Sequence, residues 1–250
     1  MNQSIQWQIA TIKDIRSETW RVKTLTLRLT KRVPHQAGQH YDIRLTAPNG
    51  YQAQRSYSIA SEPEQEGEIE LTVEKIEGGE VSTYLHDVLI PGDRLEVRGP
   101  IGGYFVWDES TNESLMLVAA GSGIVPLMAM IRTRAANKSQ VPARLLYSSR
   151  TYEDIIYRAD LEQLTAQGDG LLVFHTLTRE QPAGWRGYRR RIDEEMLAEI
   201  VRPMGTAVQV FVCGPTLLVE SVADHLVHLG IEASQIRTER FGPTGETKGS

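Results

Sequence analysis

The sequence predicts two domains of different class, an antiparallel β-barrel followed by an α/β domain built on a parallel sheet. In the first 108 residues, apolar and polar residues alternate over short segments rich in Val, Ile, Thr and Tyr, as in half-buried strands. From residue 112 onward, continuous apolar runs alternate with helical stretches, as in a parallel sheet that helices cover on both faces.

Six strands and one helix are expected in the first half. Turn signals such as Pro48-Asn49-Gly50 and Pro91-Gly92-Asp93 separate the strands, and this spacing favours a closed or nearly closed barrel. The helix is expected at 82–89, with Ser82 as its N-cap. The expected strands are 6–15, 22–29, 41–46, 54–60, 68–76 and 94–98.

Four strands, each followed by a helix, are expected in the second half. The polar segment 108–113 is the predicted domain boundary, and the Gly, Thr and Lys content of 242–250 predicts a flexible tail. The expected strands are 115–120, 143–147, 171–176 and 208–212. The expected helices are 125–134, 153–164, 193–200 and 216–229.

Composition excludes several classes of protein. With 250 residues, 40% hydrophobic and 24% charged, the chain is globular and long enough to bury a core. Its net charge of −5 argues against nucleic acid as a partner. Cys213 is the only cysteine, which excludes an internal disulfide and any four-cysteine metal site. The six histidines show no ligand spacing such as HExxH, so no metal is expected.

Neither a secretory signal nor a membrane span is predicted. The N-terminus lacks a basic segment followed by an apolar one. The longest strongly apolar run, 115–120, is far shorter than the ~20 residues that a bilayer span needs. We therefore expect a cytoplasmic protein without a membrane partner.

Two glycine-containing turns follow strands of the predicted parallel sheet. Gly121-Ser122-Gly123 follows 115–120, with Pro126 in the first turn of the next helix, and Cys213-Gly214-Pro215 follows 208–212. Small residues at such a turn let backbone N–H groups approach a phosphate, where the helix N-terminus adds partial positive charge. The alternatives are an ordinary tight turn and, for Cys213, a small buried side chain.

Two further motifs lie in the predicted barrel. In Arg55-Ser56-Tyr57-Ser58, period-two alternation places Arg55 and Tyr57 on one face, where they could hold an anion and a flat ring. Gly78-Gly79-Glu80-Val81-Ser82 opens the single helix and could bind a second phosphate. The alternatives are a solvated barrel face and a simple helix cap.

These four motifs, in this order, resemble the ferredoxin–NADP reductase family of flavin and nicotinamide electron-transfer proteins. The resemblance covers about 7–241 and implies an FAD-binding β-barrel domain at 1–108 and a Rossmann-like NAD(P)-binding domain at 112–241. It implies a flavoprotein oxidoreductase that passes electrons from NAD(P)H through FAD to a one-electron carrier. Because Cys213 cannot hold a cluster alone, that carrier is expected to be a separate ferredoxin or the iron–sulfur component of an oxygenase.

The resemblance assigns FAD-binding roles within the barrel. It implies that Arg55 binds the pyrophosphate, that Tyr57 packs on the isoalloxazine or bonds the ribityl chain, and that Ser58 bonds near N5. It also implies that backbone groups of Gly79 and Val81 cradle the pyrophosphate. The other implied FAD-binding residues are Ser56, Val73, Lys75 and Ser82.

In the second half, the resemblance implies a nicotinamide site. Cys213 would lie beside the reacting nicotinamide carbon, Phe241 would cover the flavin where the nicotinamide stacks, and Tyr157 would stack on the adenine. Together with Ser58, Cys213 and Phe241 are the implied catalytic residues. The other implied nucleotide-binding residues are Gly121, Ser122, Gly123, Pro126, Ser148, Arg150, Gly214 and Pro215.

Arginines favour NADPH over NADH as the electron donor. The 2′-phosphate of NADP adds negative charge, and Arg150 follows the second strand of the parallel sheet, where the adenosine end is expected. Arg179 and the group Arg186, Arg189, Arg190 and Arg191 add positive charge after the third strand. The alternative is a solvated charged face, with NAD as cofactor.

Two other functions stay open. One is a stand-alone reductase of flavins or quinones. The other is a non-catalytic nucleotide-binding regulator or electron-transfer subunit, although relatives of that subunit type carry a C-terminal cysteine cluster that this sequence lacks. For the reductase with a protein acceptor, Lys75, Arg94 and Arg98 are candidates for a basic rim that an acidic carrier would contact.

Overall fold

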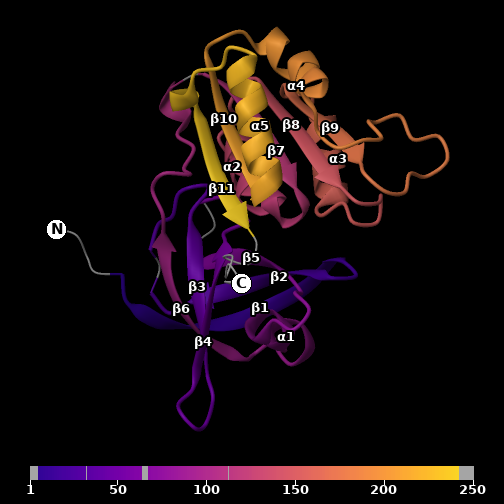
Figure 1. The fold of residues 1–250 in the computed structure, drawn as a ribbon. Helices are drawn as coiled ribbons and strands as arrows, with labels where there is room; N and C mark the ends of the chain where they lie inside the picture. The colour runs from indigo at the N-terminus through magenta and orange to yellow at the C-terminus, as the bar shows by residue number, and fades with distance from the viewer. Residues whose placement is uncertain (1–4, 32, 64–66, 112, 242–250) are drawn as a thin grey trace, which may run out of the picture.

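The computed structural model describes residues 5–31, 33–63, 67–111 and 113–241. Two sheets divide the chain, and they lie one above the other in Figure 1, with the N-terminal half below and the C-terminal half above. The predicted fold class, an antiparallel barrel-like domain followed by a Rossmann-like domain, is confirmed.

The N-terminal sheet has the strand order β4-β3-β6-β1-β2-β5, and each neighbouring pair is antiparallel. An isolated antiparallel bridge between Ile59 and Leu71 brings the chain after β4 against β5, so the two edges of the sheet meet. The strands are β1 (Trp7–Thr19), β2 (Val22–Leu29), β3 (His40–Thr46), β4 (Gln52–Ser58), β5 (Glu68–Glu74) and β6 (Arg94–Ile101).

Helix α1 (Glu80–Asp87) covers one end of this sheet and buries Val81 and Leu85 in the barrel core. Its N-cap is Gly79, so the prediction that Ser82 caps the helix is wrong. Ser82 lies inside the first turn, where its Oγ accepts the Ile76 N–H at 3.1 Å. The serine therefore fastens the preceding loop to the helix.

The C-terminal sheet is parallel, with strand order β11-β10-β7-β8-β9. Successive residues of β7 explain its continuous apolar run, because Leu117 packs in one core and Val118 in the core on the opposite face. Helices α2 and α3 contribute to the first core, and α4 and α5 to the second. The strands are β7 (Ser114–Ala120), β8 (Ala143–Ser149), β9 (Leu171–Leu177), β10 (Val208–Pro215) and β11 (Ile236–Phe241). The helices are α2 (Ile124–Ala136), α3 (Arg158–Ala166), α4 (Glu194–Val201) and α5 (Thr216–His228).

Besides shifts of up to four residues in the bounds of other elements, two elements differ from the sequence prediction. Helix α3 begins at Arg158 instead of residue 153. The reason is that Tyr157, its N-cap residue, has a left-handed backbone conformation with φ 58°. Strand β11 was not predicted, since Arg237, Thr238, Glu239 and Arg240 give it little apolar character. The predicted tail, 242–250, lies outside the described residues.

Contacts between the domains extend beyond the chain connection. Phe105 packs edge-on against Phe211 of β10, with ring centroids 5.3 Å apart. Arg237 of β11 donates to the Val106 carbonyl at 3.1 Å. Among the described residues, no helix has the length and apolar character that crossing a bilayer requires.

Candidate active site

A cleft of about 690 Å³ lies where the barrel meets the carboxyl ends of the parallel strands. Glu74 and Ile76, at the end of β5, line it from the barrel. Gly121, Ser148 and Gly214, at the ends of β7, β8 and β10, line it from the other side. Open parallel sheets bind ligands at this edge, so the cleft is the candidate nucleotide site.

The turn after β7 is tied directly to the barrel. Gly121 has φ 54°, which glycine adopts without strain, and a 3₁₀ turn (Gly121–Gly123) leads into α2. Ser122 donates from Oγ to Oε2 of Glu74 at 2.8 Å, and Arg21 pairs with Oε1 of the same carboxylate at 3.0 Å. The predicted phosphate turn thus opens beside β5.

Gly123 and Pro126 position this turn and do not line the cleft. A Cβ on Gly123 would lie 2.1 Å from the Cys213 carbonyl oxygen, so only glycine allows the turn to approach β10 so closely. Pro126 is buried in the first turn of α2. Both residues were predicted to bind the nucleotide, and the structure gives them a packing role.

At the end of β10, Cys213 is fully buried, whereas Gly214 and Pro215 line the cleft. Desolvation raises the pKa of the Cys213 thiol well above its usual range, so the thiol is neutral and a poor nucleophile. Its predicted place beside a nicotinamide ring stays a prediction. Phe241, paired with Pro215 at the end of β11, lines the same wall.

Glu239 is a candidate functional residue that the sequence analysis missed. It pairs in register with Cys213, and burial raises the pKa of its carboxyl group to about 7. Its buried Oε2 has no hydrogen-bond partner in the described part of the chain. The sequence offered no usable signal for it, because β11 was not predicted and the register of Glu239 with Cys213 depends on that strand.

Three exposed arginines, Arg150, Arg179 and Arg191, line the cleft after β8 and β9. None of them forms an ion pair with a described residue, so their charge is available to an anion. Arg190 differs, because its guanidinium pairs with Asp193 and, at 2.9 Å, with Glu195.

The predicted flavin-binding strand, β4, presents three different environments. Arg55 is exposed, with Nη1 donating to the Gln54 carbonyl at 2.6 Å, and no described carboxylate pairs with it. Tyr57 is partly buried, which raises its pKa to about 12. Ser58 is buried, and its Oγ has no hydrogen-bond partner among the described residues. An unpaired buried hydroxyl is costly in a protein interior, so this one is suited to a bound group.

Models of known protein families match both halves of the chain. An oxidoreductase FAD-binding domain model matches residues 8–106, and an oxidoreductase NAD-binding domain model matches residues 117–224. Ferredoxin–NADP reductase B of Sorangium cellulosum is 35% identical over 210 residues, which cover 82% of this chain and 85% of that protein.

The chain belongs to the ferredoxin–NADP reductase family. The glycine betaine monooxygenase reductase subunit of Pseudomonas aeruginosa is 32% identical over 231 residues, 91% of this chain. The chain spans 62% of the length of that relative. The FAD/NAD-binding domain of nitric oxide dioxygenase from Vibrio cholerae has the same fold, with a TM-score of 0.84 at 23% identity and coverage of 94% and 99%.

Three of the predicted FAD-binding side chains already have partners or are buried within the protein. Ser56 donates to Asp42 at 2.6 Å, and Val73 is fully buried in the barrel core. Lys75 is held by both carboxylate oxygens of Asp87, at 2.7 and 2.6 Å. Period-two alternation explains the burial of Val73, because it lies on the face of β5 opposite Glu74.

Tyr157 is the clearest departure from the predicted nucleotide site. Its side chain is 1% exposed, and its hydroxyl donates to Thr72 of β5. A ring without an open face cannot stack on adenine, so that prediction is wrong. Tyr157 instead joins the two domains.

The predicted basic rim needs correction, and one group of possible metal ligands was not foreseen. Besides Lys75, Arg98 is neutralised, pairing with Asp42 at 2.7 Å. Glu194, His225 and His228 bring three ligand atoms within 4.8 Å of one another, a grouping across α4 and α5 that the sequence analysis did not foresee. The side chains of Glu194 and His228 are 48% and 71% exposed, so solvent satisfies them without an ion.

Proposed function

We propose that the chain is an FAD-dependent reductase that takes electrons from NADPH and passes them to a separate one-electron carrier. The observation that carries this proposal is the shared cleft, in which Glu74 of the barrel, the Gly121 turn and Phe241 line one space. A reductase of this kind needs its flavin and nicotinamide sites to meet, and this cleft offers the place.

FAD fits the residues of the barrel. Ser58 offers an unpaired buried hydroxyl, and Arg55 offers an unpaired cation on the same strand. The N-terminal turn of α1, capped by Gly79, offers backbone N–H groups for the pyrophosphate. When bound, FAD supplies the conversion of a two-electron hydride donor to one-electron steps.

The chain's own residues contribute binding, orientation and protection from water. We propose that Phe241 shields the flavin face and that Gly214 and Pro215 form the wall beside the nicotinamide. Arg150, Arg179 and Arg191 favour NADPH, because guanidinium groups bind the 2′-phosphate.

The proposed electron acceptor is a ferredoxin or the iron–sulfur component of an oxygenase. The named relatives support this class, since they comprise a ferredoxin–NADP reductase and a reductase subunit of a monooxygenase. A cluster held by four cysteines cannot be built from these 250 residues, which contain Cys213 alone.

Anaerobic titration tests the proposal. The purified protein is expected to be yellow, to lose its flavin absorbance with NADPH at lower concentrations than with NADH, and then to reduce a [2Fe–2S] ferredoxin. A protein that takes up no FAD would overturn the proposal and favour the nucleotide-binding regulator. Reduction of free flavin or quinone, with none of ferredoxin, would favour the stand-alone reductase.

A further inference from the structure

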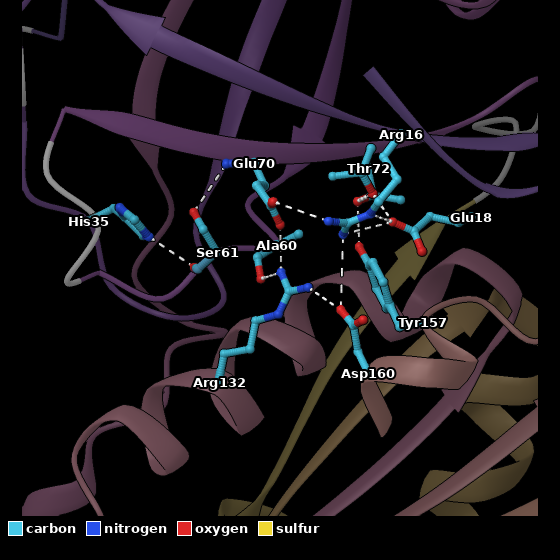
Figure 2. Close-up of polar contacts among 11 residues, drawn as sticks. Arg16, Glu18, His35, Ala60, Ser61, Glu70, Thr72, Arg132, Tyr157 and Asp160 are labelled. Atoms are coloured by element: carbon cyan, nitrogen blue, oxygen red, sulfur yellow. Dashed lines mark hydrogen bonds and ion pairs between the residues drawn. The ribbon is translucent and has the colours of Figure 1, made fainter. Parts of the chain in front are cut away.

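One face of strand β5 contacts the second domain. Glu70, Thr72 and Glu74 alternate along the strand, so their side chains share a face, while the intervening Leu71 and Val73 are buried in the barrel core. Figure 2 shows Glu70 and Thr72 directed toward the second domain. Each of the three contacts a different element there.

Glu70 contacts helix α2 through Arg132. Arg132 donates from Nη1 to Oε2 of Glu70 at 2.7 Å and to the Ala60 carbonyl at 2.9 Å. From Nη2 it donates to Asp160 of α3 at 2.7 Å, and Arg16 of the barrel lies 3.9 Å from Glu70 (Figure 2). Two cations and two carboxylates thus alternate across the domain boundary.

Thr72 contacts the segment before α3 through Tyr157. The Tyr157 hydroxyl donates to Oγ1 of Thr72, which lies 2.8 Å from Oγ1 of Thr24. Thr24 in turn donates to Glu18 at 2.6 Å. Tyr157 has φ 58°, which is unfavourable for an aromatic residue and persists only where its surroundings hold it. The bond to Thr72 is such a restraint.

A second set of bonds connects the Tyr157 segment to the cleft. The N–H of Ile156 donates to the Tyr147 hydroxyl at 3.3 Å, and that hydroxyl donates to the Gly121 carbonyl at 3.1 Å. Tyr147 is fully buried, so water does not compete for these bonds. A continuous path therefore runs from Thr72, through Tyr157 and Tyr147, to the phosphate turn.

We propose that Tyr157 and Thr72 are positioning residues that fix the Gly121 turn against the barrel and so place the nicotinamide over the flavin. The inference rests on the proposed function, but neither residue lines the cleft. Their effect passes through Tyr147 to Gly121, while Glu74 holds the neighbouring Ser122 from the barrel side.

Hydrogen exchange of the chain without added nucleotide tests the path independently of any activity. Tyr157→Phe removes only the hydroxyl, and exchange of the amides at 121–124 is expected to accelerate by roughly 2- to 10-fold, the range that one lost hydrogen bond gives. Tyr188→Phe is the matched control, because its hydroxyl bonds Glu199 in the second domain at 2.5 Å and lies off the path. Thr72→Val breaks the same bond from the barrel side, in case one variant folds poorly.

Kinetics then connect the path to the reaction. With flavin content unchanged, Tyr157→Phe is expected to slow flavin reduction at saturating NADPH, whereas Tyr188→Phe leaves it unchanged. Exchange at 121–124 that stays at the wild-type rate in both Tyr157→Phe and Thr72→Val would overturn the proposal. Failure of the wild-type protein to accept electrons from NADPH would overturn the proposed function and leave the exchange result standing.

Discussion

Among single side chains, Ser58 gives a direct test of the flavin site. Its buried hydroxyl has no partner among the described residues, so Ser58→Ala removes an unsatisfied polar group from the FAD-free chain. We expect the FAD-free variant to be at least as stable as the wild type. Its free energy of FAD binding should become weaker by roughly 1 kcal/mol, the contribution of one hydrogen bond. Thermal unfolding with and without FAD measures both effects.

Ser56→Ala is the control for this prediction, because the Ser56 hydroxyl is already bonded to Asp42. It should destabilise the FAD-free and FAD-bound chains equally, by roughly 1 kcal/mol. If Ser58→Ala behaved in the same way, its hydroxyl would have a partner within the protein and would not serve the flavin.

We predict that Glu239 makes the free energy of unfolding depend on pH. Its folded pKa, about 7, lies above the ordinary value of 4.5, so the folded chain retains a proton that the unfolded chain releases. The contribution of this carboxyl group to the free energy of unfolding is fully present below about pH 4.5 and is lost as the pH rises to about 7. Glu239→Gln stays neutral, so its stability relative to the wild type should increase by up to ~2 kcal/mol between pH 5 and pH 8. Urea unfolding of both proteins at pH 5 and pH 8 measures this change. If the variant and the wild type differed in stability by the same amount at both pH values, the pKa of Glu239 would be ordinary.

Sequence reasoning found the residues that form the cleft's turns but not the direction of every side chain. Gly121 and Gly214 were recognisable, because a glycine directly after a buried strand is typical of a turn that brings the backbone close to a ligand. Tyr157 was misassigned because its left-handed backbone and its bond to Thr72, 85 residues away, depend on tertiary contacts.

We propose that arginines in the loops after β8 and β9 favour NADPH over NADH. Arg150→Ala should weaken the binding of NADPH by roughly 1.5–3 kcal/mol, which is the contribution of a charge-assisted hydrogen bond to phosphate. The binding of NADH should not change. The ratio of the two KM values measures this effect. Arg190→Ala is the control, because Arg190 already pairs with Asp193 and Glu195. A similar loss with NADPH and NADH would place Arg150 away from the 2′-phosphate.

Most helices and strands were predictable because their periodicity is local. Strand β2 (Val22–Leu29) has the predicted bounds, since its alternation is regular and turns flank it. Strand β11 (Ile236–Phe241) escaped prediction because it lies at the sheet edge, where charged side chains such as Arg240 are tolerated. Pairing with β10 stabilises this segment as a strand, although its own sequence does not indicate one.

Buried charges of the two domains contact each other, so we expect the domains to unfold together. The side chains of Arg132 and Glu70 are 14% and 13% exposed, so removing the arginine leaves a buried carboxylate near one remaining cation, Arg16. Arg132→Ala should cost about 3 kcal/mol or more and separate the calorimetric transition into two, one for each domain. Arg28→Ala breaks an exposed pair with Glu68 inside the barrel and should change stability by less than about 1 kcal/mol. A single transition in Arg132→Ala would mean that the apolar contacts, such as Phe105 against Phe211, suffice to couple the domains.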